Sequence, residues 1–315
     1  MIMIASLVSF DRESQDRYEK LIDNTINIIN KDEVEEEQLA ELEVLICRDR
    51  DLSEEFVLRC KKLKLIYVVS AGVEKLPFKV IRQKGILVAN AAGICDDAIS
   101  DYVLGVMLAF SSKIYDCILY KENSYWKPYL YTDTLRGKTL TIVGTGKIGK
   151  AICHKAKVFG MNVIGVRRSK KLEKEFDGIE TFHNLNEVLS YSDYIVSTVP
   201  LTDETYHLFN RDMFLSMKET AVFINISRGG VVDENALIRA LNEKKIFGAA
   251  LDVFEKEPLP KDNPLWDIGN LIISPHSSGR LCDFMDYAMD IFATNYNDYK
   301  NNRTLTNQVN VELGY

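Results

Sequence analysis

The chain has 315 residues, of which 46% are hydrophobic and 27% are charged, and its formal net charge is −7. This length suits two domains better than one ordinary core. A surface of negative sign repels phosphate backbones, which argues against nucleic acid as a partner. No apolar stretch reaches the roughly 18 residues that a bilayer span needs, so we expect no membrane-spanning segment.

The N-terminus and the cysteines indicate the compartment. Residues 1–8 are apolar but lack a basic leader and a small-residue cleavage site, so they predict a first strand and not a signal peptide. Six cysteines are scattered without a C-x-x-C pair, and most of them lie in apolar segments. This pattern is typical of buried thiols in a reducing compartment. The sequence therefore predicts a cytoplasmic protein without structural zinc or disulfides.

Short apolar runs alternate with amphipathic stretches along the chain, which is typical of βα units and parallel sheets. In the first third, the predicted strands are Ile2–Val8, Val44–Cys47, Leu65–Val69 and Ile86–Ala89. A helix is predicted over Ser53–Lys61, with Ser53 as its N-cap. The first third is therefore expected to form one α/β unit.

A long helix is predicted next, over Asp96–Tyr120, because apolar residues recur there at helical spacing. A second set of strands follows, at Thr139–Val143, Val163–Val166, Tyr194–Thr198, Ala221–Ile226, Gly248–Val253 and Leu271–Ser274. A last amphipathic helix, roughly Cys282–Asn301, is expected to pack back on the first domain. The long helix would then connect two α/β domains.

A glycine-rich loop directly follows the strand Thr139–Val143. It carries G-x-G-x-x-G and comprises Gly144, Thr145, Gly146, Lys147, Ile148 and Gly149. Gly144 allows a tight turn, Gly146 lets the backbone approach a pyrophosphate, and Gly149 permits close packing of the next helix on the sheet. A diphosphate would lie at the positive end of that helix. The pattern alone is weak, but the strand before it and the βα unit behind it favour a dinucleotide site over a structural turn.

The end of the next strand predicts which dinucleotide is bound. In such folds, an acidic residue about 20 positions past the glycine loop marks a site for NAD. The residue at this place is Arg167, and Arg168, Ser169, Lys170 and Lys171 follow it. A 2′-phosphate would meet charged donors and a hydroxyl at Arg167, Arg168 and Ser169. The sequence therefore predicts NADP(H) in preference to NAD(H), and the alternative is a basic surface turn without a ligand.

Four blocks in the second half of the chain resemble the D-isomer-specific 2-hydroxyacid dehydrogenases. They are Asn225–Leu237, Ala250–Pro260, Asn263–Trp266 and Ser274–Gly279. The resemblance covers nearly the whole chain and is nearest to the NADP-type, glyoxylate/hydroxypyruvate reductase-like branch. It implies a catalytic arginine, glutamate and histidine, which match Arg228, Glu257 and His276.

The same resemblance implies the domain arrangement. It predicts two doubly wound parallel-sheet domains of the α/β class. A Rossmann cofactor domain (residues 98–280) would be inserted in a discontinuous, flavodoxin-like substrate domain (residues 1–97 and 281–315). The small-molecule partner implied is a 2-keto or 2-hydroxy acid, and the identity of its R group is not readable from the sequence.

The chemistry of the three matched residues suits this reaction. Arg228 can bind the carboxylate and the carbonyl oxygen of a 2-keto acid through its planar fork of donors. His276 would protonate the carbonyl oxygen as hydride arrives, and would remove the hydroxyl proton in the reverse direction. A carboxylate at Glu257 would favour the imidazolium and fix its tautomer, which favours reduction at neutral and mildly acidic pH. A glutamate at this place also argues against the formate-oxidising branch.

Each assignment has a simpler alternative. Arg228 is a surface charge in that alternative, although it follows an apolar strand and precedes two glycines. His276 would be a structural histidine, although among the four histidines only His276 lies in a strand-to-loop turn at a predicted carboxyl edge. The role of Glu257 rests on the resemblance, because its neighbours would fit any polar loop.

Further residues are implied more weakly. Asp252 matches a family position near the nicotinamide carboxamide, or it caps a loop. Backbone N–H groups at Ala71 and Gly72, in a turn after a strand, would bind the substrate carboxylate, although the turn could also be a plain βα loop. Pro200, Thr205 and Ile226 would line the cofactor site.

Two other functions remain open. One is a phosphoglycerate or phosphite dehydrogenase on the same scaffold, although phosphoglycerate dehydrogenases often carry regulatory extensions and this chain stops soon after its last predicted helix. The other is a nucleotide-sensing binding protein that resembles the C-terminal-binding corepressors, although no disordered tail is evident. A homodimer is expected, with the helix Asp96–Tyr120 and its neighbours at the contact.

Overall fold

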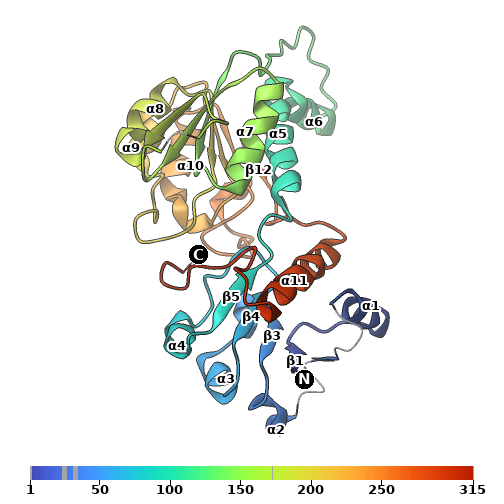
Figure 1. The fold of residues 1–315 in the computed structure, drawn as a ribbon. Coiled ribbons are helices and arrows are strands. Elements are labelled where there is room, and N and C mark those ends of the chain that lie inside the picture. Colours follow the sequence, from blue (N-terminus) through green and yellow to red (C-terminus); the bar gives the residue numbers. More distant parts are fainter. Residues whose placement is uncertain (1, 23–26, 31–34, 172, 315) are drawn as a thin grey trace. The chain divides into compact units, whose positions relative to one another are not determined.

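The computed structural model describes residues 2–22, 27–30, 35–171 and 173–314. The chain divides into two compact units, residues 1–94 with 281–315 and residues 95–280 (Figure 1). Each unit is built on one parallel sheet. The predicted fold class is therefore confirmed, and the predicted strands are found within two residues at each end.

The first unit has a five-stranded sheet in the order β2-β1-β3-β4-β5, the flavodoxin-like order. Its strands are β1 (Ile4–Ser6), β2 (Ile28–Asn30), β3 (Val44–Cys47), β4 (Leu65–Val68) and β5 (Leu87–Asn90). Its helices are α1 (Arg12–Ile22), α2 (Glu36–Leu39), α3 (Glu54–Arg59), α4 (Phe78–Lys84) and α11 (Phe284–Lys300). As predicted, Ser53 caps α3 by accepting a hydrogen bond from the amide of Phe56.

The last helix completes this first unit. The hydroxyl of Tyr67 on β4 donates to the carbonyl of Ala288 on α11 over 2.6 Å. The ring of Phe292 on α11 lies 5.1 Å from that of Tyr67, and both side chains are buried. Burial of these apolar surfaces draws the C-terminal helix onto the N-terminal sheet, which makes the unit discontinuous in sequence.

The second unit has a seven-stranded sheet in the order β12-β11-β10-β9-β6-β7-β8. Its strands are β6 (Thr139–Val143), β7 (Asn162–Arg167), β8 (Gly178–Thr181), β9 (Tyr194–Ser197), β10 (Val222–Asn225), β11 (Gly248–Leu251) and β12 (Leu271–Ile273). Its helices are α5 (Asp96–Ser111), α6 (Ile114–Glu122), α7 (Lys147–Val158), α8 (Leu185–Tyr191), α9 (Arg211–Ser216) and α10 (Glu234–Asn242). The order reverses at β6, as in a Rossmann fold.

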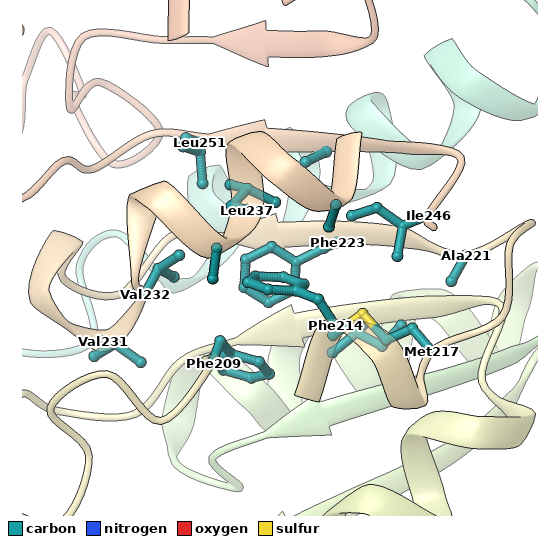
Figure 2. Packing of buried hydrophobic residues seen from close by; sticks show 14 of the residues in the cluster. Phe209, Phe214, Met217, Ala221, Phe223, Val231, Val232, Leu237, Ile246 and Leu251 are labelled. Carbon is teal, nitrogen blue, oxygen red and sulfur yellow. The ribbon is translucent and has the colours of Figure 1, made fainter. Parts of the chain in front are cut away.

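Both faces of this sheet are buried, which explains why its strands are continuous apolar runs. Phe223 on β10 packs on one face, while its neighbours Val222 and Ile224 pack on the other. Figure 2 shows Phe223 with Phe209 and Phe214, whose ring centroids lie 4.7 and 5.4 Å away. Contacts of this kind hold the strands, and therefore the loops at their ends, in place.

The single long helix predicted over Asp96–Tyr120 is wrong. The chain ends α5 at Ser111 and begins α6 at Ile114, and the two helices are bent by 67°. Lys113 between them has a left-handed φ of 59°, which ends a right-handed helix. The hydroxyl of Ser111 bonds back to the carbonyl of Leu108, a competition that weakens helices at serine. The helical spacing of the apolar residues continues through this break and therefore did not reveal it.

Within the described residues, no single helix is both long and apolar enough to cross a bilayer. The bent pair of α5 and α6 meets the requirements of length and composition only when the two helices are counted together. Eight residues of α5 are buried inside the second unit, among them Val103 and Met107.

Candidate active site

The predicted site residues of the second unit follow the strands at one edge of its sheet. All seven strands are parallel, so their carboxyl ends meet at this edge. The cofactor-site residues follow three of these strands: after β6 come Gly144–Gly149, at the end of β7 come Arg167–Ser169, and after β9 come Pro200 and Thr205. The other predicted residues follow the next three: after β10 come Ile226 and Arg228, after β11 come Asp252 and Glu257, and after β12 comes His276. Open α/β sheets bind ligands at this edge, where the strand order reverses.

The glycine loop has the geometry that its sequence predicts. Gly144 has a φ of 110°, and a Cβ added to it would lie 2.4 Å from Oγ1 of Thr198. A Cβ on Gly149 would lie 2.2 Å from the carbonyl oxygen of Gly144. A Cβ on Gly146, in contrast, would meet no atom within 4 Å. Packing therefore requires the first and third glycines, and the second leaves open space beside the loop.

This loop fits the diphosphate of a dinucleotide. The helix α7 begins at Lys147, and its N-cap is Gly146, which offers no side chain to the amides of the first turn. The positive end of the helix and the amides of its first turn favour an anion at this place. Thr145 and Ile148 are half-buried, and Lys147 is exposed. The residues present therefore suit an anionic ligand.

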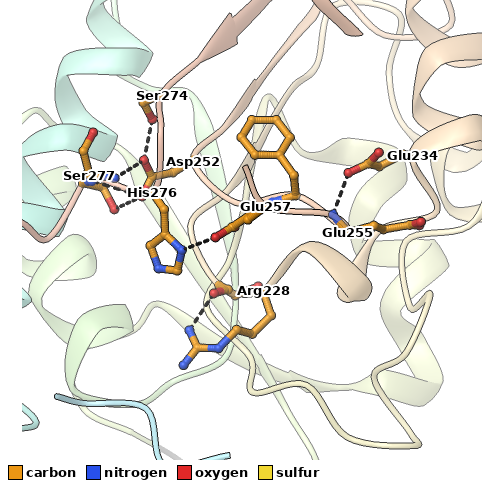
Figure 3. Close-up of polar contacts among 11 residues, drawn as sticks. Arg228, Glu234, Asp252, Glu255, Glu257, Ser274, His276 and Ser277 are labelled. Atoms are coloured by element: carbon orange, nitrogen blue, oxygen red, sulfur yellow. Dashed lines mark hydrogen bonds and ion pairs between the residues drawn. The ribbon is translucent and has the colours of Figure 1, made fainter. Parts of the chain in front are cut away.

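The structure brings His276 and Glu257 together (Figure 3). Nδ1 of His276 lies 2.8 Å from Oε2 of Glu257, whose Oε1 accepts a hydrogen bond from the amide of Phe254 over 3.1 Å. Because a carboxylate only accepts, this contact assigns the proton to Nδ1 and leaves Nε2 for another partner. The His276 side chain is 49% exposed, so a small molecule can reach it.

Arg228 is held by the loop that follows β10. Nδ2 of the buried Asn225 donates to the Arg228 carbonyl, and Oδ1 of Asn225 accepts from the amide and the hydroxyl of Ser227. A Cβ on Gly229 would lie only 1.8 Å from the carbonyl carbon of Phe254. The absence of a side chain at 229 therefore lets the Arg228 loop pack against the loop that carries Glu257.

Figure 3 draws the guanidinium of Arg228 and the imidazole of His276 pointing into the same region of the view.

A family model described as the NAD binding domain of D-isomer specific 2-hydroxyacid dehydrogenase matches residues 104–278, more than half of the chain. The chain belongs to this family. It is an NAD(P)-dependent 2-hydroxyacid dehydrogenase.

Known proteins of this family resemble most of the chain. A glyoxylate reductase from Korarchaeum cryptofilum is 34% identical over 260 residues, which cover 80% of this chain and 77% of that protein. A D-3-phosphoglycerate dehydrogenase from Methanocaldococcus jannaschii is 37% identical over 243 residues, which cover 76% of this chain and 46% of that protein. A solved D-isomer specific 2-hydroxyacid dehydrogenase from Xanthobacter autotrophicus Py2, in complex with NADPH and MES, is 25% identical; the match covers 99% of each chain with a TM-score of 0.86.

Asp252 anchors the turn that presents His276 in this dehydrogenase. The Asp252 side chain is buried, and His276 has a left-handed φ of 51°, a strained conformation that persists only where the surrounding contacts hold it. Oδ1 of Asp252 accepts from the Ser277 amide and the Ser274 hydroxyl, and Oδ2 accepts from the amide and hydroxyl of Ser278. These are loop-capping contacts, and a contact with the nicotinamide stays a prediction.

Replacement of Asp252 by Asn is expected to destabilise this turn. Each carboxylate oxygen accepts from a backbone N–H, so an amide in either orientation places its NH₂ group against one of these donors. We expect a loss of about 1–3 kcal/mol in unfolding free energy and a lower kcat, measured by urea unfolding and keto-acid reduction. Ser278→Ala is the control, since it removes one hydroxyl donor to Asp252 and keeps both backbone N–H donors. Unchanged stability and kcat in Asp252→Asn would contradict this account.

The cations at the end of β7 have carboxylate partners. Arg167 pairs with Glu173 over 2.5 Å, and Nε of Arg168 lies 3.0 Å from Oε2 of Glu204. Lys170 pairs with Glu180 over 3.2 Å, and Ser169 is exposed. Sequence reasoning missed these acids because they lie up to 36 positions from the cations that they contact, with no spacing pattern to mark them.

The remaining predicted residues have defined places. Thr205 is buried, and its hydroxyl donates to the carbonyl of Pro200 over 2.6 Å, so Thr205 shapes the loop after β9. Ile226 is buried at the end of β10. Ala71 and Gly72 belong to the first unit, after β4, where the Ala71 carbonyl accepts from Nδ2 of Asn90 and the Gly72 carbonyl accepts from the Ser70 hydroxyl.

A second histidine–glutamate pair, which sequence reasoning also missed, lies beside the first. Nε2 of His207 is 3.0 Å from Oε1 of Glu255, two residues before Glu257. The Glu255 amide donates to Glu234 at the start of α10 over 2.7 Å. Partial burial raises the pKa of the Glu234 carboxyl, although the hydrogen bond from Glu255 opposes this shift. These contacts hold the loop that carries Glu257.

Proposed function

We propose that this dehydrogenase reduces a small 2-keto acid, of the glyoxylate or hydroxypyruvate class, to the D-2-hydroxy acid. The observation that carries this proposal is the contact of 2.8 Å between His276 and Glu257, next to the loop of Arg228. It supplies an imidazole that is held at Nδ1 and can exchange a proton with a substrate through Nε2, at the sheet edge where the glycine loop offers a dinucleotide site. The resemblance to the K. cryptofilum glyoxylate reductase supports the substrate class.

Each residue of the proposed site has its own role in the reaction. A bound nicotinamide dinucleotide supplies the hydride. Arg228 binds the substrate carboxylate and polarises the adjacent carbonyl through its fork of donors. His276 donates a proton from Nε2 to the carbonyl oxygen, and Glu257 stabilises the imidazolium through Nδ1. The contact of the Ala71 and Gly72 backbone N–H groups with the substrate carboxylate, which the family resemblance implies, stays a prediction. In the reverse direction, Nε2 removes the hydroxyl proton.

A panel of substrates tests this proposal. Glyoxylate, hydroxypyruvate, longer 2-keto acids and 3-phosphoglycerate are assayed with both nicotinamide cofactors, and the product is analysed for its configuration. We expect the highest kcat/KM with a small 2-keto acid and a D-product. The M. jannaschii relative supports phosphoglycerate dehydrogenase as the second candidate. Turnover of 3-phosphoglycerate alone would favour that activity, and no turnover at all would favour a nucleotide-sensing binding protein.

The preferred cofactor is expected to be NADPH. Arg167, Arg168 and Ser169 stand where an NAD-specific fold has an acid, and the X. autotrophicus relative was solved with NADPH. One charge-assisted hydrogen bond contributes about 1.5–3 kcal/mol, so we expect kcat/KM to be at least about tenfold higher with NADPH than with NADH. Arg167→Asp should shift the ratio of kcat/KM toward NADH. Equal values for both cofactors in the unmodified enzyme would contradict this prediction.

A homodimer is the expected assembly, with α6 and the segment after it at the contact. No side chain of α6 is buried, and Ile114 and Ile118 on it are half-exposed. The segment after α6 exposes four aromatic side chains, Tyr125, Trp126, Tyr129 and Tyr131. Such a concentration of exposed apolar surface marks an interaction site. We propose a second copy of the chain as the partner, because a two-fold dimer pairs the same patch on both copies.

Light scattering tests this assembly at micromolar concentration. We expect the mass of a dimer, and we expect Trp126→Ser with Tyr131→Ser to shift it toward the monomer. Leu58→Ser is the matched control, since Leu58 is also exposed but lies in the other unit. A monomeric unmodified enzyme would contradict the prediction.

The proposed compartment is the cytoplasm. All six cysteines lie in the described part of the chain and are free thiols. Cys47, Cys60 and Cys153 are buried, which raises the pKa of their thiols. Six free thiols fit a reducing compartment.

A further inference from the structure

The cationic turn at the end of β7 contains its own anion. Nη1 of Arg167 lies 2.5 Å from Oε1 of Glu173, while Nζ of Lys150 on α7 lies 2.7 Å from Oε2 of the same carboxylate. Glu173 therefore bridges the strand that ends at Arg167 and the helix that begins at the glycine loop. Lys150 has a second, longer contact of 3.3 Å with Glu175.

This bridge is more protected than ordinary surface ion pairs. The side chains of Arg167 and Glu173 are only 27% and 19% exposed, so solvent screens them less than fully exposed pairs. Hydrogen bonds from Lys150 and, next, from Arg167 lower the pKa of the Glu173 carboxyl. Glu173 is therefore a carboxylate at neutral pH, where a dinucleotide would bind.

We infer that Glu173 is a specificity-determining residue, whose carboxylate competes with the 2′-phosphate of NADPH for Arg167. The inference rests on the cofactor site proposed above. An NAD-type acid is missing at position 167, but Glu173 brings a carboxylate to the same guanidinium from six positions further along. When a phosphate takes Arg167, Lys150 still holds the other oxygen of Glu173. Binding of the phosphate therefore breaks one of the two ion pairs of Glu173 and keeps the other. The competition from Glu173 lowers the preference for NADPH without abolishing it.

The second cation of the turn has a weaker competitor. Arg168 pairs with Glu204 over 3.0 Å, but the two side chains are 49% and 70% exposed. Exposed pairs contribute little free energy, so this pair should yield to a phosphate more readily. Glu173 is therefore the carboxylate to test.

The test is Glu173→Gln, which keeps the size of the side chain and removes its charge. Calorimetric titration with 2′,5′-ADP measures the affinity of the 2′-phosphate site without catalysis. The control ligand is 5′-AMP, which has no 2′-phosphate. We expect 2′,5′-ADP to bind about tenfold more tightly, which corresponds to about 1.4 kcal/mol, and 5′-AMP to change less than about twofold. The ratio of kcat/KM for NADPH over NADH should rise by the same factor, through KM and not kcat.

Two further variants isolate the contact with Arg167. Glu175→Gln removes a contact of Lys150 but none of Arg167, so the affinity for 2′,5′-ADP should stay within about twofold. Arg167→Ala should weaken binding of 2′,5′-ADP. In that background, Glu173→Gln should have no further effect, because the two changes act through one pair.

The outcomes separate this inference from the proposed function. If Arg167→Ala weakens binding of 2′,5′-ADP but Glu173→Gln leaves it unchanged, the inference is wrong and the NADPH site stands. If Glu173→Gln strengthens binding while no 2-keto acid is reduced, the inference stands and the proposed reaction is wrong. If Arg167→Ala leaves the affinity for 2′,5′-ADP unchanged, the inference and the NADPH site are both wrong.

Discussion

His276→Ala is expected to lower kcat for 2-keto acid reduction by ~10²–10⁴-fold, the range of general acid catalysis. His276 presents Nε2 from a half-exposed side chain, and Glu257 holds the imidazole ring through Nδ1. Removal of the ring leaves the carbonyl oxygen without this proton donor. Binding of the dinucleotide, measured by calorimetry, should change little, because the glycine loop follows a different strand. A variant that retains more than about a tenth of kcat would exclude the role.

His207→Ala is the matched control for this experiment. His207 also pairs with a glutamate, Glu255, at 3.0 Å, and its loop lies next to that of Glu257. A histidine that only supports the loop should change kcat far less than His276 does. Glu257→Gln adds a second reading, since an amide can hold Nδ1 but does not stabilise the imidazolium. kcat for 2-keto acid reduction should then fall, whereas an unchanged kcat would argue against the pair.

Arg228→Lys is expected to reduce kcat/KM for the 2-keto acid severely, although the charge is kept. One ammonium group cannot reproduce the two parallel hydrogen bonds of a guanidinium fork. The loss of one charge-assisted hydrogen bond corresponds to about 1.5–3 kcal/mol, and therefore to roughly ten- to a hundredfold in kcat/KM. Steady-state kinetics measures the effect, with Arg239→Lys on the exposed face of α10 as the control. Equal kcat/KM in Arg228→Lys and the unmodified enzyme would refute the assignment.

Much of the site was predictable because its parts are local in sequence. An apolar strand, a glycine turn and a helix start within 11 residues identify the loop Gly144–Gly149, since each step has its own backbone requirement. Arg228 and His276 were assigned from the family resemblance, and the sequence agrees with it because each follows a strand, and the carboxyl ends of parallel strands share one edge. The sequence offered no such signal for Asn225, Glu173 or Glu255, whose partners are set by the path of loops.

By itself, the sequence determined the positions of ten of the twelve strands that the structure describes, because periodicity is a property of neighbouring residues. It did not reveal the short strands β2 and β8, which have three and four residues and lie at the sheet edges, nor the break at Lys113. The tertiary structure alone decided three features: the strand order, the hydrogen bonds of Asp252 to the turn of His276, and the ion pair of Arg167 with Glu173. The physical reason is that these contacts join residues from different elements, whose separation depends on sheet register and packing and not on local propensity.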